Sequence, residues 1–199
     1  MKFQSLFSLA LPATVMGLAL PIGFYNRDEF LAKRDAAASF EPTGDEYLLK
    51  TQLVSNNDTS LSKFNNLYLT AFHTGAGTND AVLTADKDSA ATGFLNETAD
   101  GSYQEFDFGT EFPWSLEIGY EPYTAWAPVT INAGLAEAGD GFFTFTPSGL
   151  VWNVTQFDGW LVCDWWHTTP QLFWKTGVAY SNSSLPTSCA EVHLVKESL

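Results

Sequence analysis

The chain has 199 residues, with 9 basic and 23 acidic side chains and a formal net charge of −14. A field of that sign repels nucleic acid and anionic membrane surfaces, so neither is expected as a partner. Apolar residues make up 45% of the chain and aromatic residues 15%, which is enough for a packed core and excludes a disordered chain.

The N-terminus has the layout of a secretory signal. Lys2 precedes an apolar run over residues 6–18, and Gly17-Leu18-Ala19 supplies the small residues of a cleavage site. The apolar run is too short to span a bilayer. We therefore expect residues 1–19 to be a signal peptide that is cleaved after Ala19, and the protein not to span a membrane.

A second boundary is predicted at the dibasic pair Lys33-Arg34. Such pairs in a secreted precursor resemble sites for a processing protease, and cleavage after Arg34 would make residues 20–34 a propeptide. The alternative is a pair of basic residues in a flexible leader. The remaining residues, 35–199, have the length of a single secreted domain.

The two cysteines, Cys163 and Cys189, are expected to form one disulfide, because the compartment is oxidising and the two residues lie in one domain. The bond would close a loop of about 27 residues, worth roughly 3 to 4 kcal/mol in the chain-entropy model. A reactive thiol or a thiolate metal ligand is the alternative.

Four Asn-Xaa-Ser/Thr sequons indicate the same compartment, and each needs an exposed turn to carry a glycan. Three of them fall in expected loops or strand ends. The fourth, Asn153, follows a predicted strand closely and is the doubtful acceptor. The four acceptors are Asn57, Asn96, Asn153 and Asn182.

Short runs of β-branched and aromatic residues recur after residue 40, separated by turn-forming residues, and helical periodicity is absent there. This pattern predicts an all-β domain, either an antiparallel β-sandwich or a closed barrel. A β-trefoil has a similar length and strand count and is the alternative, although no threefold sequence repeat is visible. The expected strands cover residues 46–54, 66–73, 81–84, 103–108, 114–118, 129–132, 141–146, 150–154, 160–164, 171–174 and 190–195.

Two turns are specified by their residues. Pro147-Ser148 followed by Gly149 predicts a hairpin turn, and Asp158-Gly159 is a pair that tolerates positive φ. Together they predict a three-stranded meander over residues 142–164.

The stretch from Gly159 to Trp174 holds four of the seven tryptophans. Aromatic rings beside a carboxylate and an imidazole are the materials of sugar-binding surfaces and of metal centres. Both faces of the run 160–163 are apolar, so this part is expected to be buried. The corner that follows is therefore the candidate ligand-binding segment, and it comprises Asp164, Trp165, Trp166 and His167.

His73 and Asp80 flank a glycine-containing turn and are the second candidate pair, because they could meet across a hairpin. The turn lacks the lysine and the following helix of a phosphate-binding loop. His193, on the wetter face of the last strand, is expected to be a surface residue. A metal site would need three well-placed ligands, and the possible ones are scattered, so neither metal nor cofactor is expected.

Paired carboxylates raise the possibility of a secreted hydrolase, because glycosidases place two acids around a sugar. The acids in question lie in no recognisable motif, and no Gly-Xaa-Ser-Xaa-Gly elbow occurs either. No catalytic residue is therefore assigned. These acids are Asp107, Glu111, Glu117 and Glu121.

Four segments carry a family resemblance: residues 47–51 (YLLKT), 67–80 (LYLTAFHTGAGTND), 112–114 (FPW) and 160–167 (WLVCDWWH). The chain resembles small secreted proteins of filamentous fungi without assigned activity, some of which are labelled IgE-binding protein. The resemblance implies a secreted fungal extracellular or cell-surface protein, and it brings no catalytic residues.

Together these observations favour a secreted, non-enzymatic, glycosylated β-domain that acts outside the cell or at the cell wall. A polysaccharide is the expected partner, and the protein is expected to be a monomer. Two alternatives remain. One is a hydrolase with acidic catalytic residues, and the other is an effector or allergen-like protein that a host protein recognises.

Overall fold

The computed structural model of the chain divides into two units, residues 1–37 and residues 38–199. The structure describes residues of the second unit: 41–55, 59–121, 124–134, 141–165, 168–177 and 185–199. The predicted leader, with Ala19 and the Lys33-Arg34 site, lies outside these residues.

The described residues form twelve strands and two short 3-10 turns, η1 (Ser62–Phe64) and η2 (Lys87–Ser89). Within the described part of the chain, no helix has the length and apolar character needed to cross a membrane. The strands are β1 (Tyr47–Leu53), β2 (Tyr68–Gly75), β3 (Thr78–Thr84), β4 (Thr92–Thr98), β5 (Gly101–Asp107), β6 (Trp114–Ile118), β7 (Trp126–Ala133), β8 (Phe143–Thr146), β9 (Gly149–Trp152), β10 (Phe157–Asp164), β11 (Pro170–Thr176) and β12 (Cys189–Glu197).

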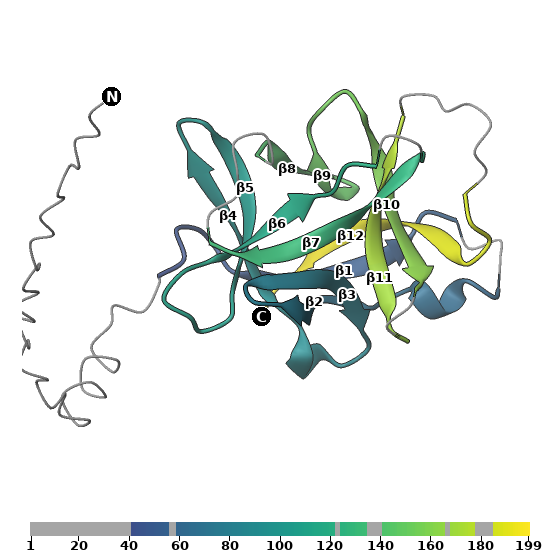
Figure 1. Ribbon diagram of the computed structural model, residues 1–199, viewed down its shortest axis with the longest axis horizontal. Coiled ribbons are helices and arrows are strands. Elements are labelled where there is room, and N and C mark those ends of the chain that lie inside the picture. The colour runs from purple at the N-terminus through teal and green to yellow at the C-terminus, as the bar shows by residue number, and fades with distance from the viewer. Residues whose placement is uncertain (1–40, 56–58, 122–123, 135–140, 166–167, 178–184) are drawn as a thin grey trace, which may run out of the picture. The chain divides into compact units, whose positions relative to one another are not determined.

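Strand pairing closes the sheet on itself (Figure 1). Antiparallel ladders run from β1 through β4, β5, β6, β7, β3, β11, β10 and β12, and β12 pairs again with β1 along six residue pairs. The prediction of an all-β domain is confirmed, and of the two leading architectures the structure has the closed barrel.

The pairings also repeat after every four strands. Three hairpins, β2–β3, β6–β7 and β10–β11, pair with one another through β3–β7, β7–β11 and β11–β3. Within each repeat the first and fourth strands lie side by side: β1 with β4, β5 with β8, and β9 with β12. This threefold connectivity is that of a β-trefoil, the alternative that the sequence left open.

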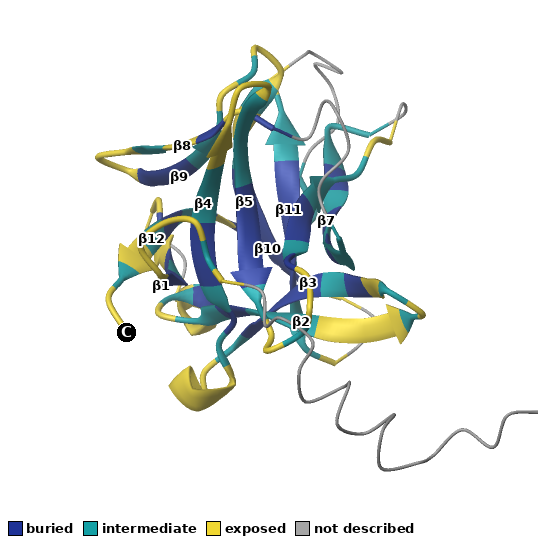
Figure 2. Cartoon of the chain, turned by 90° about the vertical axis from the view of Figure 1, so that its left-hand side faces the viewer, coloured by how far each residue is buried: buried dark blue, intermediate teal, exposed yellow. Residues whose placement is uncertain are grey.

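The barrel core follows from strand alternation. On β10, Trp160 and Val162 point into the main core, while Leu161 and Cys163 point to the opposite side and pack in a smaller cluster with Phe173. All four residues of the run 160–163 are buried, which confirms the prediction that it is covered on both faces. Figure 2 shows the same burial along the middle of β5, β10 and β11.

The β8–β9 hairpin turns at Pro147-Ser148, as predicted. Gly149 has φ +111°, and a Cβ at this position would stand 2.2 Å from the carbonyl oxygen of Leu194, so only glycine fits. The predicted meander is wrong in its second half. Asp158-Gly159 lies inside β10 at a register shift, and β9 pairs with β12.

The strand β4 is not among the predicted strands, because Gly93 and the sequon at Asn96 are typical of a loop. The structure explains the glycine. A Cβ on Gly93 would lie 2.8 Å from Nε2 of Gln104 and 3.3 Å from the ring of Phe106, both on β5. The close packing of β4 on β5 therefore requires a residue that has a low strand propensity.

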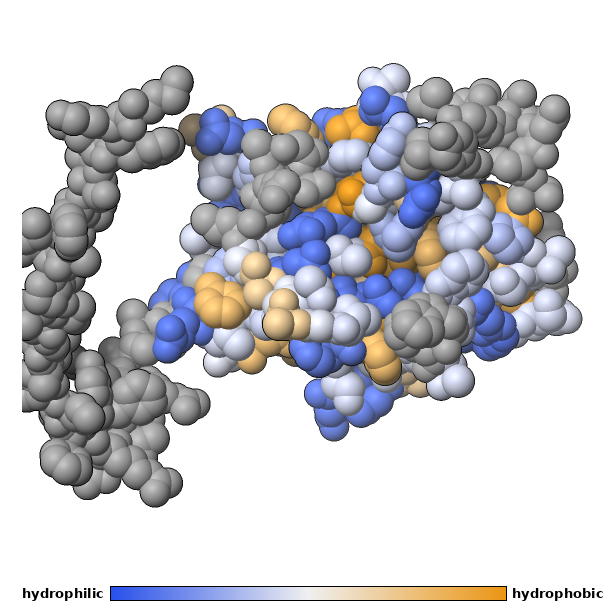
Figure 3. Space-filling view, viewed as in Figure 1, coloured by the Kyte–Doolittle hydropathy of each residue, from blue (hydrophilic) through white to orange (hydrophobic). Residues whose placement is uncertain are grey.

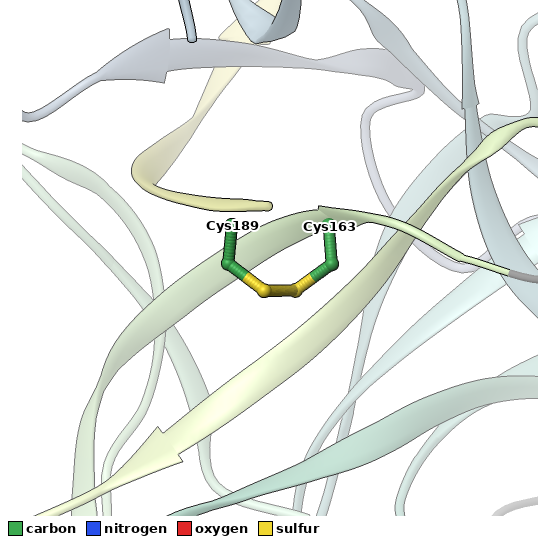
Figure 4. Close-up of a disulfide and its surroundings, with 2 residues drawn as sticks. All are labelled: Cys163 and Cys189. Carbon is green, nitrogen blue, oxygen red and sulfur yellow. A yellow bond between two sulfur atoms is a disulfide. The ribbon is translucent and has the colours of Figure 1, made fainter. Parts of the chain in front are cut away.

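Cys163 and Cys189 form the predicted disulfide (Figure 4). They are directly opposite each other on β10 and β12, with their Cα atoms 4.0 Å apart, and both are buried. The bond therefore fixes two strands that also share a ladder.

Candidate functional site

Each of the three hairpins, β2–β3, β6–β7 and β10–β11, has one side that faces the barrel core and one side that faces away from it. Residues 81, 129 and 172 belong to the main core, so their neighbours along each strand point to the other side. We call this second side, together with the ring that packs on it, the hairpin face. Its residues are Phe72, Asp80, Glu117, Trp126, Thr130, Asn132, Gln171, Phe173 and Trp165.

A row of polar side chains crosses this face. Asp80 on β3 is directly opposite Thr130 on β7, and Thr130 is in turn opposite Glu117 on β6. Neighbouring strands are about 4.8 Å apart, so the backbones that carry the two acids are separated by roughly 10 Å. Two carboxylates thus flank one hydroxyl on the same surface.

Asn132 orients one of these acids. Its Nδ2 donates to Oε2 of Glu117 at 2.6 Å and lies 3.2 Å from Oγ1 of Thr130, while its Oδ1 accepts from the backbone N–H of Asn79 at 3.3 Å. The amide therefore has partners on both ends. Its contacts hold the carboxylate of Glu117 close to Thr130.

Three aromatic rings pack together beside the polar row. The centroids of Trp126, Trp165 and Phe173 are 5.1 to 5.4 Å apart, and each pair meets edge to face. Phe173 is buried and Trp165 is 40% exposed, so Trp165 is the outer ring. In the ladder Phe173 is opposite Pro128, which stands between Trp126 and Thr130 on β7 and links the rings to the polar row.

Gln171 lies on the same side of β11 as Phe173. It is opposite Val82 on β3 and Cys163 on β10, and it is 2% exposed. Its Oε1 has no hydrogen-bond partner. A buried carbonyl oxygen without a donor is costly, and a ligand that supplies an N–H or O–H group would relieve that cost.

The lysines close to this region are paired with acids. Lys63 forms an ion pair with Asp164, and Lys175 forms ion pairs with Asp158 at 3.2 Å and Glu191 at 3.0 Å. Burial alone would lower the pKa of Lys175, but the hydrogen bonds and charges of Glu191 and Asp158 raise it above its ordinary value. These cations are thus engaged with acids outside the polar row.

Of the ligand-binding residues predicted from the sequence, the structure brings Trp165 and Asp80 onto one face. Asp164 ends β10 next to Trp165, is exposed and is paired with Lys63. Trp166 and His167 lie outside the described residues. On the side of the molecule seen in Figure 3, hydrophilic residues surround smaller apolar areas.

His73 does not meet Asp80. The register pairs it with Asn79, whose Oδ1 lies 3.4 Å from Nδ1 of His73, and it places Asp80 opposite Phe72 on the other side of the hairpin. His193 is partly exposed between the buried residues Val192 and Leu194, as expected for a surface position. Among the described residues, no group of three His, Cys, Asp or Glu side chains could hold a metal ion.

The four acids considered for hydrolysis do not gather at one place. Asp107 accepts a hydrogen bond from the backbone N–H of Gly109 at 2.6 Å, whereas Glu111 and Glu121 are exposed residues outside the strands. Glu117 alone lies on the hairpin face. Its partner acid there is Asp80, which sequence reasoning had placed with His73.

The acid that the sequence did not single out is Glu105, which is 1% exposed on β5. Burial raises its pKa above the ordinary value, and the hydrogen bond from Nδ2 of Asn96, at 3.2 Å, opposes that rise. Strand alternation gave no hint, because Glu105 is on the side of β5 away from Phe106 and the main core.

The fold and the hairpin face define a class: a disulfide-bonded β-trefoil domain with an aromatic and acidic surface on its three hairpins. The chain belongs to the family described as a domain of unknown function (DUF7907), which matches residues 44–198. Neither a curated protein nor a solved structure matches the chain.

Proposed function

We propose that the protein is secreted by a filamentous fungus, acts in the medium or at the cell surface, and binds glycan through the hairpin face without catalysing a reaction. The signal-like N-terminus, the sequons and the resemblance to small secreted fungal proteins support the location. The disulfide is compatible with an oxidising compartment.

One observation carries the binding function. The ring of Trp165 is exposed and held edge-on by Trp126 and Phe173, next to a row of hydroxyl, amide and carboxylate groups. A sugar ring has an apolar face that stacks on indole and a rim of hydroxyls that need such hydrogen-bond partners. Because the surface ring is supported from below, it does not have to be ordered when the ligand binds.

Binding of the purified secreted protein to chitin, β-glucan and mannan tests the proposal. We expect wild type to bind at least one of them, and Trp165→Ala to weaken that binding by roughly tenfold, equivalent to about 1.4 kcal/mol. Tyr120→Ala is the matched control, because it removes an aromatic ring that is 79% exposed and is not part of the hairpin face.

The control variant should bind as wild type does. No binding of wild type to any of the three polysaccharides would overturn the proposal. Turnover of any of them by wild type would overturn its non-enzymatic part and favour the hydrolase alternative, in which case Glu117→Gln is the first variant to assay.

Glycosylation is proposed at Asn153 rather than at Asn96. Asn153 is exposed just beyond β9, whereas Asn96 lies inside β4 with its Nδ2 donating to Glu105 and its Oδ1 accepting from Oγ1 of Thr43. This reverses the ranking expected from the sequence. Loss of an endoglycosidase-sensitive mass in Asn153→Gln, and its retention in Asn96→Gln, is the expected result. Asn57 and Asn182 lie outside the described residues.

A further inference from the structure

Phe142 is a large apolar residue that the fold holds in solvent. Its side chain is 49% exposed, and its φ of +77° lies in the left-handed region, which bulky side chains rarely adopt. The next residue, Phe143, begins β8 and is buried in the core. An exposed aromatic residue with a strained backbone is a reason to look for a function at its position.

Hydrogen bonds and close packing fix the backbone at this point. The indole Nε1 of Trp152 donates to the carbonyl oxygen of Gly141 at 2.8 Å. The backbone N–H of Asn153 donates to the carbonyl oxygen of Phe142, also at 2.8 Å. A Cβ on Gly141 would lie 3.0 Å from the ring of Tyr103 on β5, so the chain passes closely over that ring. The place of the exposed Phe142 is therefore set by contacts with two other strands.

Asn153, the acceptor of a sequon, is directly opposite Phe142. The ladder between β8 and β9 pairs Phe143 with Trp152, and the hydrogen bond from Asn153 to Phe142 continues it by one position at the open end of the hairpin. Hydrogen-bonded residues that are opposite each other in an antiparallel ladder have Cα atoms about 5.5 Å apart. Asn153 and Phe142 are both exposed, so an aromatic ring lies beside the asparagine that would carry the glycan.

The first sugar of an N-linked glycan is N-acetylglucosamine, and it is joined to the side-chain amide of the asparagine. A pyranose ring has an apolar face that stacks on aromatic rings, and such stacking on Phe142 would remove apolar surface from water. Because the sugar is already attached to the chain, the contact is intramolecular and has a high effective concentration.

We propose that the first sugar of a glycan on Asn153 stacks on Phe142, so that the open end of the β8–β9 hairpin is a binding site for the protein's own glycan. This inference rests on the glycosylation of Asn153 proposed above. The contact makes the glycan a part of the folded domain and stabilises it, because a ring that would otherwise face water is covered.

A double-mutant cycle tests the contact. Secreted wild type, Asn153→Gln, Phe142→Ala and the double variant are unfolded in urea. Loss of the glycan in Asn153→Gln should raise the unfolding equilibrium constant about threefold, as expected for one ring contact. The same substitution should have almost no effect in the Phe142→Ala background. Thr155→Ala removes the sequon but keeps the asparagine, and it should reproduce the result of Asn153→Gln.

Phe112→Ala is the matched control, because Phe112 is 43% exposed but lies in the segment before β6. In its background, Asn153→Gln should have the same effect as in the wild-type background. Trimming of all glycans to the first N-acetylglucosamine with an endoglycosidase should preserve the difference between wild type and Asn153→Gln. Loss of that difference after trimming would assign the effect to the outer sugars and would overturn the proposal.

The masses of wild type and Asn153→Gln distinguish this inference from the proposed glycosylation. Absence of a glycan on Asn153 would overturn both. If the glycan is present and its loss has the same effect with and without the Phe142 ring, the inference is wrong and the modification stands. The same conclusion follows if its loss changes the unfolding equilibrium in neither background.

Discussion

The rings of Trp165 and Trp126 meet edge to face, with ring centroids 5.4 Å apart and an angle of 83° between the planes. Trp165 makes a similar contact with Phe173. The exposed indole is thus anchored by two rings of the domain, one from β7 and one from β11, and these contacts contribute to stability.

Replacing Trp165 with alanine is therefore expected to lower the free energy of unfolding by about 1 to 3 kcal/mol, because two edge-to-face contacts are lost and each is worth roughly 0.5 to 1.5 kcal/mol. Urea denaturation followed by tyrosine and tryptophan fluorescence measures the change. Tyr120→Ala should stay within about 0.5 kcal/mol of wild type. Equal losses in the two variants would mean that Trp165 is not held by its neighbours.

Removal of the disulfide by the double substitution Cys163→Ala/Cys189→Ala should cost roughly 3 to 4 kcal/mol in the chain-entropy model, since the bond closes a separation of 26 residues. The same loss should appear when wild type is denatured in a reducing agent. The double variant, in contrast, should be insensitive to that agent. An unchanged midpoint in the double variant would show that the β10–β12 ladder holds the two strands without the bond.

The interactions of Glu197 are expected to make the domain less stable at low pH. Hydrogen bonds from Lys50, Lys87 and Tyr68 lower the pKa of Glu197 from 4.5 to about 2. Because the pKa is lower in the folded state, this contribution is present above pH 4.5 and is lost as the pH falls from 4.5 towards about 2.

The melting temperature of Glu197→Gln should therefore be lower than that of wild type at neutral pH, and the two should converge in strong acid. Glu111→Gln, at an exposed position outside the strands, serves as the charge-matched control and should follow the wild-type curve. Parallel curves for wild type and Glu197→Gln across the acid range would contradict the prediction.

For Glu105, the expected pH dependence of stability has the opposite sign to that for Glu197. Its pKa is raised by burial, so its contribution to stability is present below its unfolded pKa of 4.5 and is lost as the pH rises through the folded value. Glu105→Gln should gain stability relative to wild type on going from acid to neutral pH. Asn96→Ala should lose stability at neutral pH, because the buried carboxylate then lacks its donor. Thermal melts at both pH values measure these differences.

Most of the strands could be predicted, because runs such as 114–118 and 160–164 combine strand-forming residues with clear turn signals at their ends. The strand β4 could not be predicted, because the glycine at position 93 is required by close packing against Gln104 and Phe106 on β5, and that contact is not visible in the sequence. The threefold repeat of the strand pairings could not be predicted from the sequence for a related reason. Core positions in the three repeats are filled by different apolar residues, and only the pairings show their equivalence.

Some residues of the candidate site could be predicted from the sequence, and others could not. Trp165 stood out because it lies in a tryptophan-rich corner that follows a strand buried on both faces. The sequence predicts a pair of Asp80 with His73, but the register pairs His73 with Asn79. A one-residue difference in register decides which side of a hairpin a residue occupies. Thr130, Asn132 and Gln171 carry no signal in the sequence. Their place on the hairpin face depends on pairings between β3, β7 and β11, which are distant in the chain.

Because of the long ladder between β1 and β12, the barrel can close only late in the synthesis of the chain. Tyr47–Leu53 finds its main partner only in Cys189–Glu197, so a nascent chain cannot close the barrel until nearly all of the domain has been synthesised. Cys189, the first residue of that last strand, becomes available for oxidation at the same stage. Barrel closure and oxidation are therefore coupled in time, and the yield of folded domain should depend strongly on the redox potential of its surroundings during folding.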